Sequence, residues 1–156
     1  MGMLFSYIPI KQSEIDDLLD DPGRAEDFME ENADRSQDID KAWHGLHFLL
    51  TGDSNPAQFP IGFIMDGGEI VSGDEVPIVR IFRPHEVKSI AEAVADSRWS
   101  ALRERFDPKA LTEAQVYPDI WENESALDYL KENYEQLRRD IGQAAAHHNG
   151  LLICIG

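Results

Sequence analysis

The sequence predicts an α/β protein of the mixed α+β kind, a single compact domain in which helices pack on a mixed sheet. Strand-like apolar runs stand at both ends of the 156-residue chain and near its middle, and helical patterns fill the intervals. That order is typical of a sheet covered by helices, and a three-layer arrangement is compatible with it. One domain over residues 1–156 is expected, because no repeat or linker divides the chain and 42% hydrophobic residues can supply a core.

The N-terminal segment predicts one strand followed by two short helices. Residues 3–10 form a mostly apolar run that suits a strand. Ser13 can cap a helix whose apolar residues keep helical spacing, and Pro22-Gly23 then ends it. A second, acidic helix is expected over residues 24–32.

A stronger helix is expected from Ile39 to about Leu50, with Asp38 as its N-cap. Gly52 stands where helices commonly end in a left-handed residue. The following residues, 51–60, are dense in turn formers and predict a loop. This helix and its loop carry the candidate chemistry discussed below.

The middle of the chain predicts a group of short strands. Residues 61–65, 69–72 and 78–82 are apolar runs of strand length. Asp66-Gly67-Gly68 separates the first two runs, and Asp-Gly between apolar runs is typical of a hairpin turn. A hairpin over 61–72 is therefore expected.

The C-terminal half predicts four helices. Pro84, Trp99 and Asp107 begin three segments with helical spacing of apolar residues. Ser125 begins the longest helix, whose apolar positions step by three and four and therefore form one buried stripe. Gly150 is expected just after its end, as the C′ residue.

The last strand, residues 151–155, is almost wholly apolar, which favours a central position covered on both faces. Its Cys154 is the only cysteine and is expected to be an inert buried thiol. The N-terminus lacks the basic start and apolar core of a signal peptide, and no apolar run is long enough to span a bilayer. Cytoplasmic localisation is expected.

The chain carries a formal net charge of −16, and this acidity is concentrated. Residues 14–40 hold twelve acids and two bases, a net charge of −10. Nucleic acids and anionic membranes are poor partners for such a chain, because both are bound mainly by Lys and Arg. Solubility alone can account for an acidic face. The functional alternative is a docking surface for a basic protein partner.

A helical projection places Asp40, His44 and His47 along one edge of the helix, at i, i+4 and i+7. Two imidazoles and a carboxylate that converge can hold zinc, and this trio is the candidate metal site. Asp40 can alternatively orient His44 as an acid–base pair. A third interpretation is structural: the three side chains pin neighbouring loops by hydrogen bonds, so that His47→Ala costs stability alone.

The block Asp38-Ile-Asp-Lys-Ala-Trp43-His-Gly-Leu-His47-Phe-Leu-Leu-Thr-Gly52, together with Val116-Tyr117-Pro118, resembles the YfbM-like family of bacterial proteins of unknown function. The resemblance implies a compact α/β domain of the bacterial cytoplasm and implies no activity. The family pattern contains His47 but requires no histidine at position 44, which weakens the metal trio. Trp43, His47, Thr51 and Gly52, facing the loop 51–60, are therefore the candidate ligand-binding residues.

Two functions follow as hypotheses, with no cofactor expected because the sequence has no Gly-rich phosphate loop or dinucleotide fingerprint. The first is a non-enzymatic interaction protein that docks a basic partner through residues 14–40, with toxin neutralisation as an analogy only. The alternative is a small-ligand protein or metal-dependent enzyme with a pocket near Trp43, His47 and the loop 51–60. The loop 117–121, with two large aromatics, is expected to be an exposed recognition element.

Overall fold

The structure is a computed structural model that describes residues 2–72 and 75–156. The strands are β1 (Phe5–Ile10), β2 (Gln37–Asp38), β3 (Glu69–Ile70), β4 (Ile78–Phe82) and β5 (Gly150–Ile155). The α-helices are α1 (Gln12–Asp20), α2 (Ala25–Glu31), α3 (Trp43–Thr51), α4 (Pro84–Asp96), α5 (Trp99–Glu104), α6 (Pro108–Glu113) and α7 (Ala126–Ala146). Three short 3-10 helices are η1 (Pro22–Arg24), η2 (Ala33–Arg35) and η3 (Asp40–Ala42).

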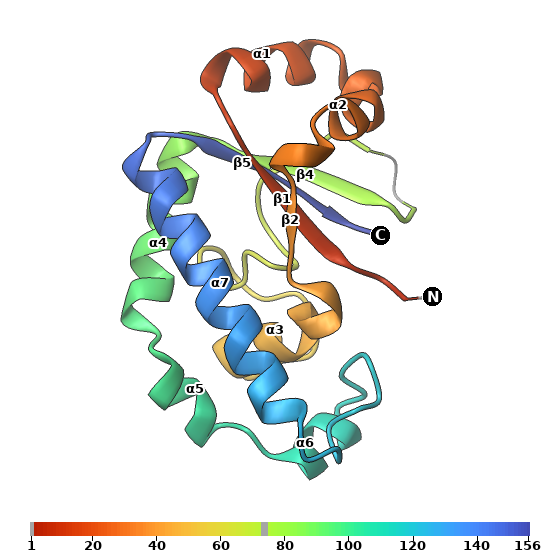
Figure 1. Ribbon diagram of the computed structural model, residues 1–156, viewed down its shortest axis with the longest axis vertical. Coiled ribbons are helices and arrows are strands. Elements are labelled where there is room, and N and C mark those ends of the chain that lie inside the picture. The colour runs from red at the N-terminus through yellow and green to blue at the C-terminus, as the bar shows by residue number, and fades with distance from the viewer. Residues whose placement is uncertain (1, 73–74) are drawn as a thin grey trace.

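The five strands form one sheet in the order β2-β1-β5-β4-β3. Its four ladders are all antiparallel, so the predicted α+β class is confirmed while the sheet is not mixed in strand direction. The connection between β4 and β5 explains this direction. After β4 the chain leaves the sheet at Phe82, passes through α4 to α7 and re-enters the sheet at the same end (Figure 1). Phe82 at the end of β4 therefore pairs with Leu151 at the start of β5, and the two strands are antiparallel.

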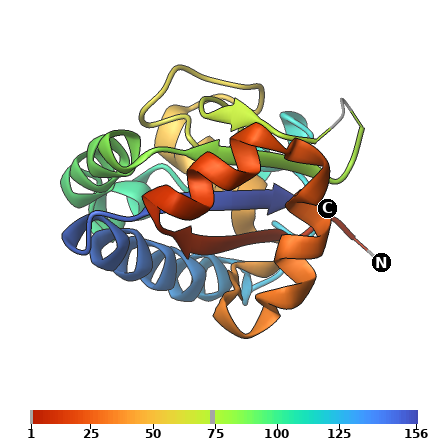
Figure 2. The same cartoon turned by 90° about the horizontal axis from the view of Figure 1, so that it is seen from above.

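Helices cover both faces of the sheet, which confirms the three-layer arrangement. Alternate residues of a strand point to opposite faces, and on β5 Leu151 and Ile153 pack into the large core with α3, α4 and α7. Leu152 packs with Ile15 and Leu18 in a smaller core beneath α1 and α2. Figures 1 and 2 show α1 and α2 lying across one face while the longer helices occupy the other. The predicted central, doubly covered position of the last strand is thus confirmed.

The predicted strand over 61–65 is wrong, and the hairpin over 61–72 is wrong with it. This segment forms consecutive turns, and only Glu69–Ile70 pairs with β4. The cause is Arg80 of β4, whose side chain points into the large core and is 4% exposed. Its guanidinium donates to the carbonyls of Phe63 and Ile64, which a strand would have offered to a neighbouring strand.

The helix predicted from Ile39 begins later than expected. Asp38 lies in β2, η3 follows it, and α3 starts only at Trp43. Asp38 still serves as a cap of the irregular entry, because its Oδ1 accepts the backbone N–H of Asp40 at 2.9 Å. The predicted helix end is confirmed: Gly52 has φ +77° and its N–H donates to the Phe48 carbonyl.

Two other helix ends differ from expectation. The first turn of α1 is closed by Glu14, whose carboxylate accepts the Lys11 N–H at 2.9 Å, and not by Ser13. After α7 the left-handed residue is His148, with φ +56°, while Gly150 is already the first residue of β5. A histidine adopts this conformation at a modest cost that the following hydrogen bonds offset. Across the described residues, no helix is both long and apolar enough to cross a membrane.

Candidate functional site

His44 joins α3 to two distant segments. Its Nδ1 accepts the backbone N–H of Tyr117 at 2.8 Å, so the proton of the neutral ring lies on Nε2. That Nε2 is 2.7 Å from the Ser54 carbonyl, to which it donates. The neighbouring Trp43 ring stacks on the imidazole at 5.2 Å, and the indole N–H donates to the Met3 carbonyl at 2.9 Å. Both ring nitrogens of His44 are thus occupied by backbone groups.

His47 faces the core. The residue has no exposed surface, and its Nε2 lies 2.7 Å from the Asn55 carbonyl. Within the described part of the chain its Nδ1 has no hydrogen-bond partner. Burial lowers the pKa of His47 below its ordinary value of 6.5, so the ring is neutral at pH 7. His44 and His47 together fasten consecutive carbonyls of the loop 51–60 onto α3.

Thr51 and Gly52 end α3 and shape the start of the loop. The Thr51 hydroxyl donates to the His47 carbonyl at 2.8 Å and accepts the Asp53 N–H at 3.1 Å. These are capping contacts of a helix C-terminus. Trp43 and His47 are buried along α3, whereas Thr51 is half-buried and Gly52 exposed at its end. A role for these four residues in ligand binding stays a prediction.

The metal trio does not assemble. Asp40 Oδ2 accepts the Tyr129 hydroxyl at 2.8 Å, whereas His44 and His47 bond to loop carbonyls. Burial and, to a smaller extent, the hydrogen bond to Asp40 raise the pKa of Tyr129. The hydroxyl therefore stays protonated and donates to Asp40. In residues 2–72 and 75–156 no group of three or more His, Cys, Asp or Glu side chains is placed to hold a metal ion. The contacts match the structural interpretation of these residues instead.

Replacing His47 with alanine is expected to lower the free energy of unfolding by about 1–3 kcal/mol, because the Asn55 carbonyl loses its donor and a void opens. The loss should depend on pH. His47 has a folded pKa below its unfolded value, so its contribution is complete above about 6.5 and declines as the pH falls below that value. Urea unfolding at several pH values measures both effects.

The matched control is His85→Ala, since His85 is exposed in the first turn of α4. That change should alter stability by less than about 0.5 kcal/mol. A stability difference between wild type and His47→Ala that stays constant from about pH 7.5 to about pH 5, a range that spans the ordinary pKa of about 6.5, contradicts a buried neutral imidazole.

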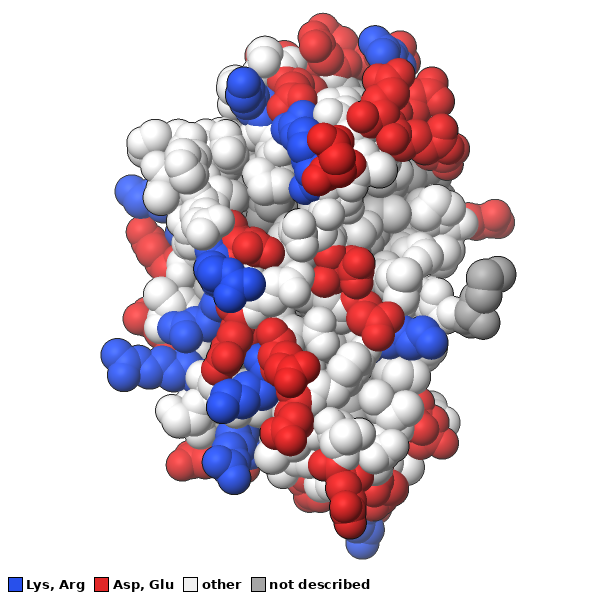
Figure 3. All heavy atoms as spheres, in the orientation of Figure 1, with Lys and Arg blue, Asp and Glu red and all other residues white. Residues whose placement is uncertain are grey.

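The acidic residues 14–40 lie mostly on a surface that we call the acidic cap, formed by residues 12–35 of α1, η1, α2 and η2. Ten of the twelve acids are exposed, nine of them on the acidic cap. Figure 3 shows carboxylates gathered at the top of the molecule, over α1 and α2. Of the twelve, only Glu14 forms an ion pair with another described residue.

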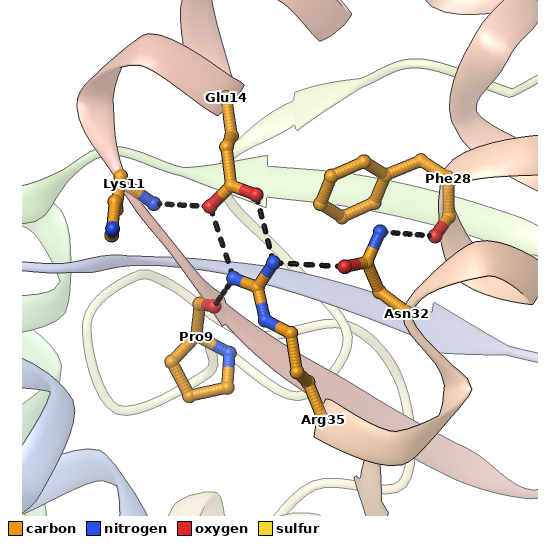
Figure 4. A network of polar contacts seen from close by, with 6 residues as sticks. All are labelled: Pro9, Lys11, Glu14, Phe28, Asn32 and Arg35. Atoms are coloured by element: carbon orange, nitrogen blue, oxygen red, sulfur yellow. Dashed lines mark hydrogen bonds and ion pairs between the residues drawn. The ribbon is translucent and has the colours of Figure 1, made fainter.

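That ion pair anchors the acidic cap to the sheet (Figure 4). Arg35 donates to both carboxylate oxygens of Glu14, at 2.8 and 3.0 Å, and also to the Pro9 carbonyl and the Asn32 side chain. The Arg35 hydrogen bond lowers the pKa of Glu14, and the same bond raises the pKa of Arg35. Arg35 is one of two basic residues in the acidic stretch 14–40, and this scarcity was the signal that could have indicated the anchor.

A cleft between β1 and α7 was missed by sequence reasoning. Its volume is about 430 Å³, and Tyr7, Gln136 and Asp140 line its inner part. The Tyr7 hydroxyl donates to Asp140 Oδ2 at 2.5 Å and accepts from Gln136 Nε2 at 3.3 Å. The sequence does show polar residues beside the apolar stripe of α7. It does not show that they lie against β1, because that contact depends on the fold.

The expectation of an exposed recognition loop at 117–121 is wrong for its larger aromatic. Trp121 is 1% exposed, and its indole N–H donates to the Val116 carbonyl at 2.7 Å. Tyr117 is half-buried, and its hydroxyl accepts the Met3 N–H at 2.8 Å. The loop closes the end of the large core beneath α3 and α7, and it does so because both aromatics find backbone partners there.

The geometry defines a single-domain α+β protein of three layers, with a histidine-fastened loop on one side of the sheet and an acidic cap on the other. The chain belongs to the family described as "Domain of unknown function (DUF1877)", which matches residues 1–154. The predicted family resemblance is thus confirmed. A comparison with curated proteins finds no match.

Among solved structures, the chain is similar to the crystal structure of a protein of unknown function, YfbM from Escherichia coli. The two share 24% identity with a TM-score of 0.79, and the match covers 98% of this chain and 99% of that chain. At this identity the likeness shows the fold alone.

Proposed function

We propose that this protein is an interaction domain whose acidic cap docks a basic segment of a protein partner. The observation that carries the proposal is the unpaired state of the carboxylates. Nine exposed acids lie on the acidic cap, and none of them is in an ion pair with another described residue. Such a surface attracts cationic groups and speeds their association, because its own charge is not neutralised internally.

The acidic cap is held rigidly enough to present these charges in one arrangement. Arg35 ties η2 to α1 through Glu14 and to β1 through the Pro9 carbonyl. Ile15 and Leu18 bury the inner side of α1 against the sheet. A preformed surface loses little conformational entropy when a partner binds, so more of the electrostatic attraction appears as affinity.

A small hollow in the acidic cap favours a long basic side chain as the point of contact. The hollow has a volume of about 170 Å³ and is lined by Leu18 and Phe28, with Glu14, Asp17 and Arg24 around them. Lys and Arg combine an apolar stem with a charged end. In this proposal the stem packs against Leu18 and Phe28, while the charged end lies beside Asp17, which is in no ion pair with another described residue.

The test measures binding of a fluorescently labelled peptide of arginine, lysine and leucine by anisotropy, at low and high salt. One variant neutralises four exposed acids of the acidic cap: Asp16→Asn, Asp20→Asn, Glu26→Gln and Glu30→Gln. A matched control variant neutralises four exposed acids elsewhere: Glu92→Gln, Glu104→Gln, Glu113→Gln and Glu122→Gln. Both variants change the net charge by the same amount.

The acidic-cap variant should weaken binding by about tenfold or more, since each exposed charge pair contributes about 0.2–1 kcal/mol. The control should change affinity far less, and wild-type affinity should fall as salt screens the charges. Equal losses in the two variants show that net charge alone attracts the peptide and overturn the proposal. Binding that is insensitive to salt overturns it as well.

A further inference from the structure

The cleft between β1 and α7 has the size of a small-molecule site and lies apart from the acidic cap's outer surface. Its volume of about 430 Å³ falls within the usual range for ligand pockets. Tyr7 and Ala144 form its floor and are almost completely buried, while Gln37, Arg139 and Gln143 stand exposed at its rim. The walls are unusually polar for a packing defect, because four carboxamide side chains line it.

The floor holds an ordered polar network. Tyr7 is 1% exposed and donates its hydroxyl proton to Asp140, while Gln136 Nε2 donates to the Tyr7 hydroxyl and to the Asp38 carbonyl at 2.8 Å. Burial, followed by the hydrogen bond to Asp140, raises the pKa of Tyr7, so the tyrosine stays protonated. Asp140 Oδ2 accepts this proton, and the second carboxylate oxygen, Oδ1, lies 3.9 Å from Arg139 Nε.

Two guanidinium groups, Arg35 and Arg139, line the cleft, and each lies beside a carboxylate, Glu14 and Asp140 respectively. Arg35 is fixed by Glu14 and Pro9 and has one remaining N–H, on Nε, beyond its four hydrogen bonds. Arg139 is 63% exposed at the side chain, and its Nε is 3.9 Å from Asp140. Within the described residues its terminal nitrogens have no hydrogen-bond partner, so they are available to a ligand.

We propose that this cleft binds a small, hydroxyl-rich organic anion, such as a phosphorylated sugar or a sugar acid. Carboxamides and a carboxylate recognise hydroxyl groups, because they supply both donors and acceptors at short range. Arginine recognises carboxylates and phosphates through paired N–H groups. Arg139 holds the anionic group at the rim, while Asp140, Gln136 and Asn149 hold the hydroxyls above the floor.

The experiment uses the full chain and three probes, glucose 6-phosphate, gluconate and glycerol 3-phosphate, with glucose and inorganic phosphate as partial ligands. Binding is followed by isothermal titration and by amide chemical-shift changes, which locate the site. Two variants act on the exposed rim, where folding is preserved: Arg139→Gln removes the anion contact, and Gln143→Trp fills the entrance. The control, Lys131→Gln, removes one positive charge from an exposed position of α7 outside the cleft.

At least one of the three probes should bind saturably, with shifts centred on Tyr7, Asp140 and Asn149. Its affinity should exceed that of glucose and of inorganic phosphate, and Arg139→Gln should weaken it about tenfold or more while Lys131→Gln leaves it unchanged. Absence of saturable binding by all three at about 10 mM overturns the proposal, because such an interaction is weaker than a specific site provides. Binding that survives both rim variants, or that inorganic phosphate matches, overturns it too.

Discussion

Replacing Arg80 with methionine is expected to lower the free energy of unfolding by about 3–5 kcal/mol. The guanidinium donates to the carbonyls of Phe63, Gly67 and Ile64, at 3.1, 3.0 and 2.5 Å. A methionine of similar length leaves all three acceptors without their donor. The carbonyls of Phe63 and Ile64 are buried, and each unsatisfied buried group costs about 1–3 kcal/mol, while the half-buried Gly67 carbonyl adds less. Removing a buried charge offsets part of this loss, since the desolvation of the cation disappears.

Burial lowers the pKa of Arg80 to about 10, so the side chain is still charged at pH 7. Arg80→Lys keeps the charge but not the planar fork that reaches three carbonyls, and it should lose an intermediate amount of stability. The control is Arg83→Met, because Arg83 pairs with Glu69 at the surface, with exposures of 40% and 50%. That pair contributes less than about 1 kcal/mol.

Urea unfolding followed by circular dichroism measures these differences. The expected order of stability is wild type close to Arg83→Met, then Arg80→Lys, then Arg80→Met. If Arg80→Met unfolds at the same urea concentration as Arg83→Met, the guanidinium is not what holds the segment 61–68 in place, and our explanation for the absent strand fails.

Arg80 also shows where prediction from this sequence reached its limit. The apolar run 61–65 resembles the run 78–82 in length and hydrophobicity, and the main local difference is Gly62, a residue type that is uncommon inside strands. Which run pairs with β5 is decided by long-range contacts, because β4 carries the side chain that captures the carbonyls of the other run. Helices such as α4 and α7 were predictable because their apolar spacing acts within a few turns.

The histidine site was predictable in part for the same reason. The helical spacing correctly indicated that His44 and His47 lie near one side of α3, beside the loop 51–60. It could not indicate their partners, since the nitrogens bond backbone carbonyls of that loop and the N–H of Tyr117, which is 73 residues away in sequence. Asp40 was assigned to the same site. It begins η3 in a left-handed backbone conformation, with φ +52°, and its carboxylate accepts the Tyr129 hydroxyl instead.

Composition located the acidic surface but not its anchoring. The count of acids in 14–40 showed where charge concentrates, and burial confirms that most of these side chains are exposed. Which acid would be neutralised depends on Arg35 reaching across from η2 to Glu14 of α1. Similarly, the cleft beside Tyr7 exists only because α7 returns along β1 after more than a hundred residues.

Replacing Trp121 with alanine is expected to cost about 3–5 kcal/mol, the usual loss for deleting a buried tryptophan. The indole is 1% exposed and packs directly on Gly45 of α3, where an added Cβ would lie 2.5 Å from Trp121 Cη2. An exposed recognition loop would instead predict a change below about 0.5 kcal/mol. Trp121→Phe retains much of the ring and loses the hydrogen bond to Val116, so it should fall between these values.

Because Trp121 lies so close to Gly45, the effect of Gly45→Ala on stability should change sign when Trp121 is removed. This change of sign is the sharpest test of the packing. In the wild type, Gly45→Ala should destabilise by about 1–3 kcal/mol, since the rigid ring cannot move aside. In the Trp121→Ala background the clash with the ring is gone, and Leu130 Cδ2, 3.0 Å from the added Cβ, can move into the space that the ring leaves. The helix propensity of alanine should then make the same change neutral or stabilising by up to about 1 kcal/mol. A double-mutant cycle measured by urea unfolding gives the coupling directly. Additive losses would mean that Trp121 does not pack on α3, and the loop 117–121 would then have to lie away from the core.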